Sequence, residues 1–278
     1  MLYEGFSANK DPNRHNLTLA YHEVRLYMNT VRLFDPVAEL DGHERQRSSN
    51  VADNQISTSW RYGSSTDMLD LQVELVHSMF DALSDVDLSG SWYTGRVNCV
   101  PGNNTRSYAA AQSRIHLLME TRGIYLGMEN YGSRTASHIV SAMAYLKFCA
   151  ANVDEMIAVS NGQRQALVDA GKTYEESDTI ILNSAQVEHP EFDIITEKFN
   201  FGNGKISTDY QQTAYIMEPT ATRVAPTAYV IPKGLPREAE LLELLALQEI
   251  AYYELPANAA ISLQQYSGTD PTEVFLFH

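Results

Sequence analysis

Apolar, strand-like runs alternate with amphipathic helical segments in the first two thirds of the sequence, and this alternation restricts the fold more than any other feature. The runs VAEL (37–40) and SRIHLLMET (113–121) suit buried strands. Between them, residues 66–83 suit a helix with Thr66 or Asp67 as its N-cap. Its apolar side chains recur at helical spacing, at Met68, Leu71, Leu75, Met79 and Leu83. Together these segments predict an α/β fold.

Other segments complete the predicted organisation. Helices are expected at 15–34, ended by Asp35-Pro36, at 136–151, at 153–171 with Gly171 as the C-cap, and at 237–248. The polar stretches 44–66 and 87–106 are expected to be loops. Short β-like pieces follow residue 178, at 179–188, 207–218 and 226–232, and two further short strands finish the chain. The sequence therefore predicts an α/β domain over 1–172 and a smaller β-rich C-terminal region with one helix over 173–278.

Charge and composition exclude several classes of partner. The chain of 278 residues carries 35 acidic and 20 basic side chains, a net charge of −15, which disfavours nucleic acid as a partner. No run approaches the ~20 apolar residues of a membrane span. The first residues lack the basic-then-apolar pattern of a signal peptide. Cys99 and Cys149 are the two cysteines, and either one bridge or two free thiols fits them.

Four short polar pieces could carry chemistry: DPNRHN (11–16), ELDGHER (39–45), NNTRSYAAAQ (103–112) and HLLMETRG (116–123). Asn13-Arg14 would suit a substrate carboxylate, although Asn-Arg in a loop is more often a solvated turn. His43 follows Asp41 by two residues, as in an oriented metal ligand or a surface ion pair. Glu120 ends an apolar strand, where burial raises the pKa of a carboxyl group and suits a general base, and with Arg122 it could equally form a structural salt bridge.

The order of these pieces resembles the zinc carboxypeptidase family, the carboxypeptidase A-like metallopeptidases. The resemblance rests on Asn-Arg, then a helix, then D-P-x-x-x-x-D-x-H-E, then a strand ending LLMETRGIYLG and followed by NYGSRTASHIVSAMAYL. It is nearest to the bacterial branch, in which APTAYVIPKG also has a counterpart after the catalytic domain. It implies a mixed central β-sheet flanked by helices, and zinc as the cofactor.

Carried over to this chain, the resemblance implies a role for each matching residue. Asn13 and Arg14 would bind the C-terminal carboxylate of a peptide. His43 would be the third zinc ligand, and Glu120 the general base. Tyr93 and Tyr108 are both candidates for the family's mobile tyrosine, and Arg122 accompanies Glu120 as a substrate-side residue.

One family motif is missing. The first two zinc ligands of the family come from H-x-x-E upstream of Asn-Arg, and none of the eight histidines here has Glu at i+3. A further substrate-binding Arg is also absent. Two explanations are compatible with the sequence: an N-terminal portion is missing, which we prefer, or the chain is a relative that has lost its metal. In both cases we expect this polypeptide alone to bind zinc poorly.

The expected function is therefore metallocarboxypeptidase-type hydrolysis of a C-terminal peptide bond, with a metal site incomplete in this chain. The alternatives are a metal-free carboxylate- or peptide-binding relative of the same fold, and an amidohydrolase acting on a small acylated amino acid. Each implies a peptide or small carboxylate-bearing ligand. The sequence leaves the oligomeric state and the side-chain specificity open.

Overall fold

The computed structural model of the chain describes residues 12–46, 50–59, 65–93, 104–124, 128–200 and 202–256. The chain divides into two compact units, residues 1–227 and 228–278, which are considered separately below. The border predicted at residue 172 falls shortly before the first strand of a long β-ribbon, and it stays a prediction.

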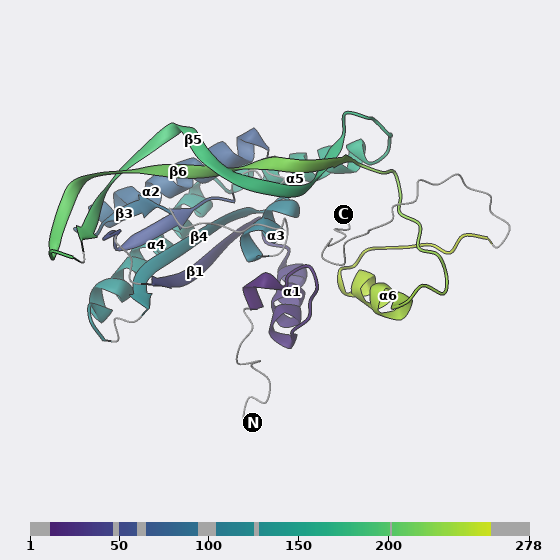
Figure 1. The fold of residues 1–278 in the computed structure, drawn as a ribbon, viewed down its shortest axis with the longest axis horizontal. Helices are drawn as coiled ribbons and strands as arrows, with labels where there is room; N and C mark the ends of the chain where they lie inside the picture. The colour runs from purple at the N-terminus through teal and green to yellow at the C-terminus, as the bar shows by residue number, and fades with distance from the viewer. Residues whose placement is uncertain are drawn as a thin grey trace, which may run out of the picture. The chain divides into compact units, whose positions relative to one another are not determined.

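A mixed four-stranded sheet lies at the centre of the first unit (Figure 1). Its strands run in the order β1 (Ala38–Gln46), β4 (Ile115–Ile124), β2 (Asn54–Ser57) and β3 (Gly90–Trp92). β1 is parallel to β4, β4 is antiparallel to β2, and β2 is parallel to β3. The predicted α/β class and the mixed sheet flanked by helices are thereby confirmed.

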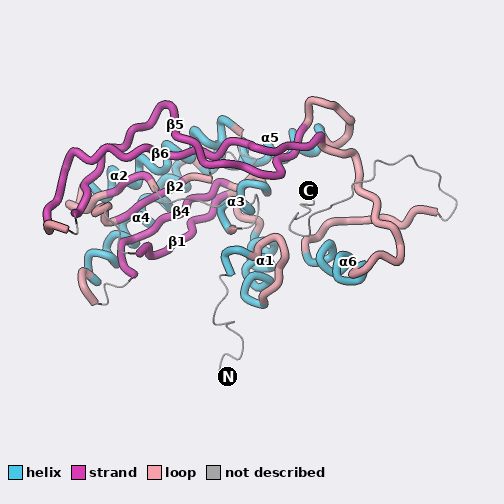
Figure 2. Tube along the Cα trace, in the orientation of Figure 1, coloured by secondary structure: helices cyan, strands magenta, loops and turns pink. Residues whose placement is uncertain are grey.

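Five α-helices and one short 3-10 helix accompany this sheet in the described part of the first unit (Figure 2). They are η1 (Pro12–Arg14), α1 (His22–Phe34), α2 (Thr66–Ser84), α3 (Thr105–Ala111), α4 (Tyr131–Ala151) and α5 (Val153–Ala170). The core joins α2, α4 and α5 to one face of the sheet. Its buried members include Ile56, Leu75, Met79, Leu117, Tyr145 and Met156. At about 25 cal/mol per Å² of apolar surface, this burial is the main stabilising contribution to the fold.

The opposite face of the sheet is polar. Side chains alternate along a strand, so residues two apart share a face and parallel register partners lie side by side. This face carries Glu39, Asp41, His43 and Arg45 from β1, and His116, Glu120 and Arg122 from β4. Helices α1 and α3 contact it: Tyr27 Oη donates to Glu39 Oε2 at 2.5 Å, and Arg106 Nη1 donates to Ser57 Oγ at 2.7 Å.

The two stretches predicted as loops contain regular structure, and those predictions were wrong in part. β1 continues to Gln46 and β2 lies within 44–66, while β3 and the start of α3 lie within 87–106. β2 has no apolar–polar alternation because every one of its four side chains is buried. Its side-chain amides donate hydrogen bonds within the sheet and to α4, as in the bond from Asn54 Nδ2 to Ser141 Oγ at 2.9 Å.

Two helix starts also differ from the prediction. The helix expected from residue 15 begins at His22, because Leu19 adopts a positive φ of 47° and Tyr21 is extended. It ends at Asp35 as predicted. The N-cap of α2 is Ser65, whose hydroxyl accepts from the amide of Met68 at 3.3 Å. Gly171 is the C-cap of α5, as predicted.

Beyond residue 178 the first unit forms one long two-stranded ribbon instead of separate short pieces. β5 (Thr179–Asn200) pairs antiparallel with β6 (Lys205–Val224), and Gly204, at a φ of 69°, lies in the turn between them. The segment 226–232 is not a strand, since Pro226 and Pro232 lack the amide donor that pairing needs. In the second unit the predicted helix is confirmed as α6 (Glu238–Leu247). Residues 250–256 form no strand, and the rest of the predicted final strands lie outside the described residues.

Candidate functional site

His43 and Glu120 are register partners on the parallel strands β1 and β4, so the structure places them side by side on the polar face of the sheet. His43 Nε2 lies 2.7 Å from Asp41 Oδ1. Burial opposes ionisation of Asp41, but the hydrogen bond and charge of His43 hold the pKa of that carboxyl below its usual range. The acid–imidazole pair is therefore an oriented one, in which Asp41 fixes the position of the ring.

Glu120 has the environment of a proton-transfer group. Burial raises the pKa of its carboxyl group above the ordinary value, and the nearby charges of His43 and Arg45 oppose that rise. Tyr93 follows β3 and interacts electrostatically with Glu120, and burial together with this carboxylate raises the pKa of the phenol. A half-buried carboxyl group with a raised pKa takes up and releases a proton closer to neutral pH than an exposed one does.

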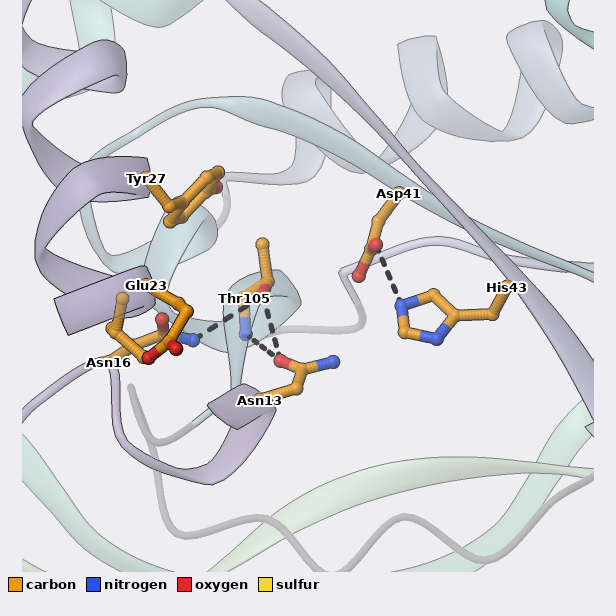
Figure 3. Close-up of a pocket in the computed structure, with 8 residues that line it drawn as sticks. Asn13, Asn16, Glu23, Tyr27, Asp41, His43 and Thr105 are labelled. Atoms are coloured by element: carbon orange, nitrogen blue, oxygen red, sulfur yellow. Dashed lines mark hydrogen bonds and ion pairs between the residues drawn. The ribbon is translucent and has the colours of Figure 1, made fainter. Parts of the chain in front are cut away.

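Asn13 lines a cavity of about 180 Å³ beside His43 (Figure 3). The amide and hydroxyl groups of Thr105 both donate to Asn13 Oδ1, each at 2.7 Å. Because the side-chain oxygen is held in this way, the Nδ2 group of Asn13 points toward His43 in Figure 3. Asn13 therefore presents a hydrogen-bond donor to whatever occupies the cavity. The cavity is lined by Asn13, Asn16, Glu23, Val24, Tyr27, Asp41, His43 and Thr105.

Arg14 belongs to the same site. Its side chain is exposed, and its Nη1 group donates to the carbonyl of Asn13 at 2.6 Å. The positive charge of Arg14 also acts on the phenol of Tyr93. Among the residues singled out from the sequence, the structure thus gathers Asn13, Arg14, His43, Tyr93 and Glu120.

Tyr108 and Arg122 were also singled out from the sequence, and the structure pairs neither of them with Glu120 in the described ranges. Tyr108 is 6% exposed, and its polar neighbours are Arg32, Arg114 and Gln112. Of the two candidate tyrosines, Tyr93 is therefore the one beside Glu120. Arg122 lies opposite Arg45 in the strand register, and in the described part of the chain no ion pair joins Arg122 to Glu120.

The described residues do not by themselves fit a zinc ion. Structural and catalytic zinc sites use three or four protein ligands. Within the described ranges no three His, Cys, Asp or Glu side chains gather closely enough to hold a metal. His43 would supply one nitrogen ligand, and its Nε2 atom is engaged by Asp41. Any metal here requires ligands from outside the described residues.

Two residues near this group were given no role on the basis of the sequence. Arg106 occupies the first turn of α3, next to Thr105, and its charge acts on both Asp41 and Glu120. His116 is completely buried below Asp41, and burial lowers its pKa to about 4. The sequence places Arg106 in the polar piece NNTRSYAAAQ, but no local pattern indicates that its side chain is buried.

Comparison of the chain with protein-family models, with curated proteins and with solved structures finds no match in any of the three. None of the helices in the described ranges is both long and apolar enough to span a bilayer. Cys149 is a free, partly buried thiol, and Cys99 lies outside the described residues.

Proposed function

We propose that this chain carries the carboxylate-binding and proton-transfer part of a metallocarboxypeptidase-type hydrolytic site, which cleaves the C-terminal residue from a peptide. The observation that carries the proposal is the pairing of His43 with Glu120 on adjacent strands, beside a cavity bordered by Asn13. The sequence resemblance assigns the same residues to the same site.

Substrate positioning follows from charge and hydrogen bonding. Arg14 supplies a guanidinium group that pairs with the terminal carboxylate of a peptide, and Asn13 supplies an amide donor in a fixed orientation. An internal peptide bond has no such carboxylate nearby, so this pair selects the end of the chain. Thr105 keeps Asn13 in place while the ligand enters and leaves.

Proton transfer falls to Glu120. As a general base its carboxylate takes a proton from the attacking water, and the resulting carboxylic acid gives that proton to the leaving amine. Its raised pKa favours both steps, because the group has to hold the proton between them. The Tyr93 hydroxyl group, which interacts with Glu120, helps to position that carboxyl group.

A second candidate is a metal-free module that binds peptide or small-molecule carboxylates. The observation in its favour is the lack of a three-ligand metal group within the described ranges. In this case Asn13 and Arg14 act as proposed, but Glu120 performs no chemistry. A related hydrolase acting on acylated amino acids would use the same residues on a shorter substrate.

A hydrolysis assay separates these possibilities. The protein is incubated with N-acylated dipeptides and N-acetyl amino acids, with and without added Zn²⁺, and the released amino acid is measured. Hydrolysis that Glu120→Gln reduces by at least about 100-fold, with Glu74→Gln unchanged, supports the hydrolase. If the compounds still bind in the presence of chelator and no amino acid is released even with added Zn²⁺, the result favours the binding module over a hydrolase that this chain completes by itself.

A further inference from the structure

Arg106 is a buried cation. Only 6% of its surface is exposed, and its side chain is a guanidinium group, which carries a positive charge in proteins. Its hydrogen bond is to the neutral hydroxyl of Ser57, at 2.7 Å. No carboxylate of the described residues forms an ion pair with it. Burying a charge is costly unless an opposite charge accompanies it, so this environment favours an anion beside Arg106.

The position of Arg106 places that anion in the candidate site. Arg106 follows Thr105, which holds Asn13, and Ser57 lies on β2 next to Leu118 of β4. The charge of Arg106 acts on the phenol of Tyr93 as well as on Asp41 and Glu120.

The neighbouring carboxylates already have other partners. Asp41 is paired with His43 at 2.7 Å, and Glu120 interacts with Tyr93, His43 and Arg45. A guanidinium group has five N–H donors in a planar fork, and Ser57 takes the bond from Nη1, so donors remain for a bidentate contact with a carboxylate. Within the described ranges, therefore, no carboxylate directly contacts the guanidinium group of Arg106.

We infer that Arg106 binds a second carboxylate of the ligand, so that the preferred ligand is a peptide ending in glutamate or aspartate. The inference rests on the proposed function, in which Arg14 binds the terminal carboxylate. Arg106 then binds the acidic side chain of the same residue. Two separate cations around one site suit a ligand with two anionic groups better than a ligand with one.

The test compares two ligands that differ only in that side chain. Binding of N-acetyl-Ala-Glu and N-acetyl-Ala-Gln is measured by calorimetry in the presence of chelator, so that no hydrolysis interferes. We expect the wild-type protein to bind the glutamate ligand on the order of 10- to 100-fold more tightly, as for a hydrogen-bonded charge. Arg106→Gln is expected to abolish this preference while leaving the affinity for the glutamine ligand within about threefold.

Controls separate binding from folding. Arg164→Gln, at a surface arginine paired with Asp35, is expected to keep the preference intact. Arg106→Lys keeps the charge but loses the fork, and is expected to retain a reduced preference. If Arg106→Gln does not fold, the wild-type preference and the Arg106→Lys variant decide the question.

Each remaining result counts against the inference in a distinct way. Equal binding of both ligands by the wild type, with both weakened by Arg14→Gln, overturns the role of Arg106 and leaves the proposed function standing. A lowered unfolding temperature in Arg106→Gln with an unchanged preference makes Arg106 a structural residue. Lack of binding of either ligand rejects the inference and the carboxylate-binding proposal together.

Discussion

His43 on β1 and Glu120 on β4 are register partners, so an imidazole and a half-buried carboxyl group lie side by side on the polar face of the sheet. The opposite, apolar face of the sheet holds the core, and this fixes the register: a shift by one residue would turn Glu120 into the core and Met119 out of it. The same packing that folds the domain therefore sets the geometry of the site.

Glu120→Gln is predicted to stabilise the protein at neutral pH. Burial raises the pKa of Glu120 above its ordinary value of 4.5, so its ionised form is less favourable in the folded than in the unfolded state. This penalty is absent below pH 4.5 and develops as the pH rises through the folded pKa. The variant should unfold a few degrees higher than the wild type at pH 7, and this gain should shrink toward pH 4.

Thermal unfolding followed by circular dichroism at both pH values measures this difference. Glu74→Gln, at an exposed position of α2, serves as the control and should show no gain. A destabilised Glu120→Gln variant at pH 7 would mean that the ionised carboxylate contributes to the fold, contrary to the proton-transfer role.

Periodicity predicted α2 but could not predict β2. Five apolar side chains at helical spacing identify the helix in the sequence, because Leu75 and the other four all face one core. In β2 the buried side chains of Asn54 and Gln55 are polar, and their hydrogen bonds to Ser141, Ser91 and the carbonyl of Trp92 come from distant parts of the chain. Those partners exist only in the folded sheet, so no local pattern identifies the strand.

In the candidate site, likewise, the sequence identified some residues and not others. Asn13, His43 and Glu120 were found from short motifs and their order along the chain. Arg106 was missed because its significance lies in burial beside a neutral partner, which depends on the packing of α3 against β2. The choice of Tyr93 over Tyr108 likewise needed the position of β3 next to β2.

His116→Leu is predicted to reduce the loss of folding stability that the wild-type protein shows as the pH falls from 6.5 to 4. Burial lowers the pKa of His116 from 6.5 to about 4, so the ring stays neutral in the folded protein while it becomes protonated in the unfolded chain. The associated stability is complete above pH 6.5 and is lost as the pH falls from 6.5 to 4. The loss is on the order of 3 kcal/mol.

Urea unfolding of wild type and variant at pH 7 and pH 4.5 measures the slope, which is the change in the free energy of unfolding between the two pH values. His22→Gln changes an exposed histidine and should leave the wild-type slope in place. An unchanged slope in His116→Leu would show that other groups carry the acid sensitivity.

Leu75→Ala is predicted to destabilise the α/β core strongly. Leu75 is completely buried between α2 and the sheet, so the variant leaves a cavity that its neighbours fill only in part. The expected loss is about 2–5 kcal/mol, seen as a lower midpoint in urea unfolding. Leu33→Ala, at a leucine of α1 that is 77% exposed, should lie within about 0.5 kcal/mol of wild type. Similar effects of the two variants would contradict the assignment of α2 to the core.

Thr105→Val is predicted to weaken ligand binding more than it weakens the fold. The variant keeps the backbone bond to Asn13 Oδ1 but removes the hydroxyl bond of 2.7 Å, so the amide of Asn13 is held by one contact instead of two. A neutral hydrogen bond contributes about 0.5–1.5 kcal/mol, which predicts roughly 2- to 13-fold weaker binding of an N-acylated dipeptide.

The matched control is Thr30→Val on α1, whose hydroxyl bonds to the carbonyl of Leu26 at 2.9 Å, and it should bind as wild type does. Because Thr105 acts through Asn13, the loss caused by Thr105→Val should largely disappear in an Asn13→Ala background. Calorimetric titration of the four combinations measures this coupling. Fully additive losses would show that Thr105 affects the ligand by a route other than Asn13, and the fixed orientation of that amide would then have no part in recognition.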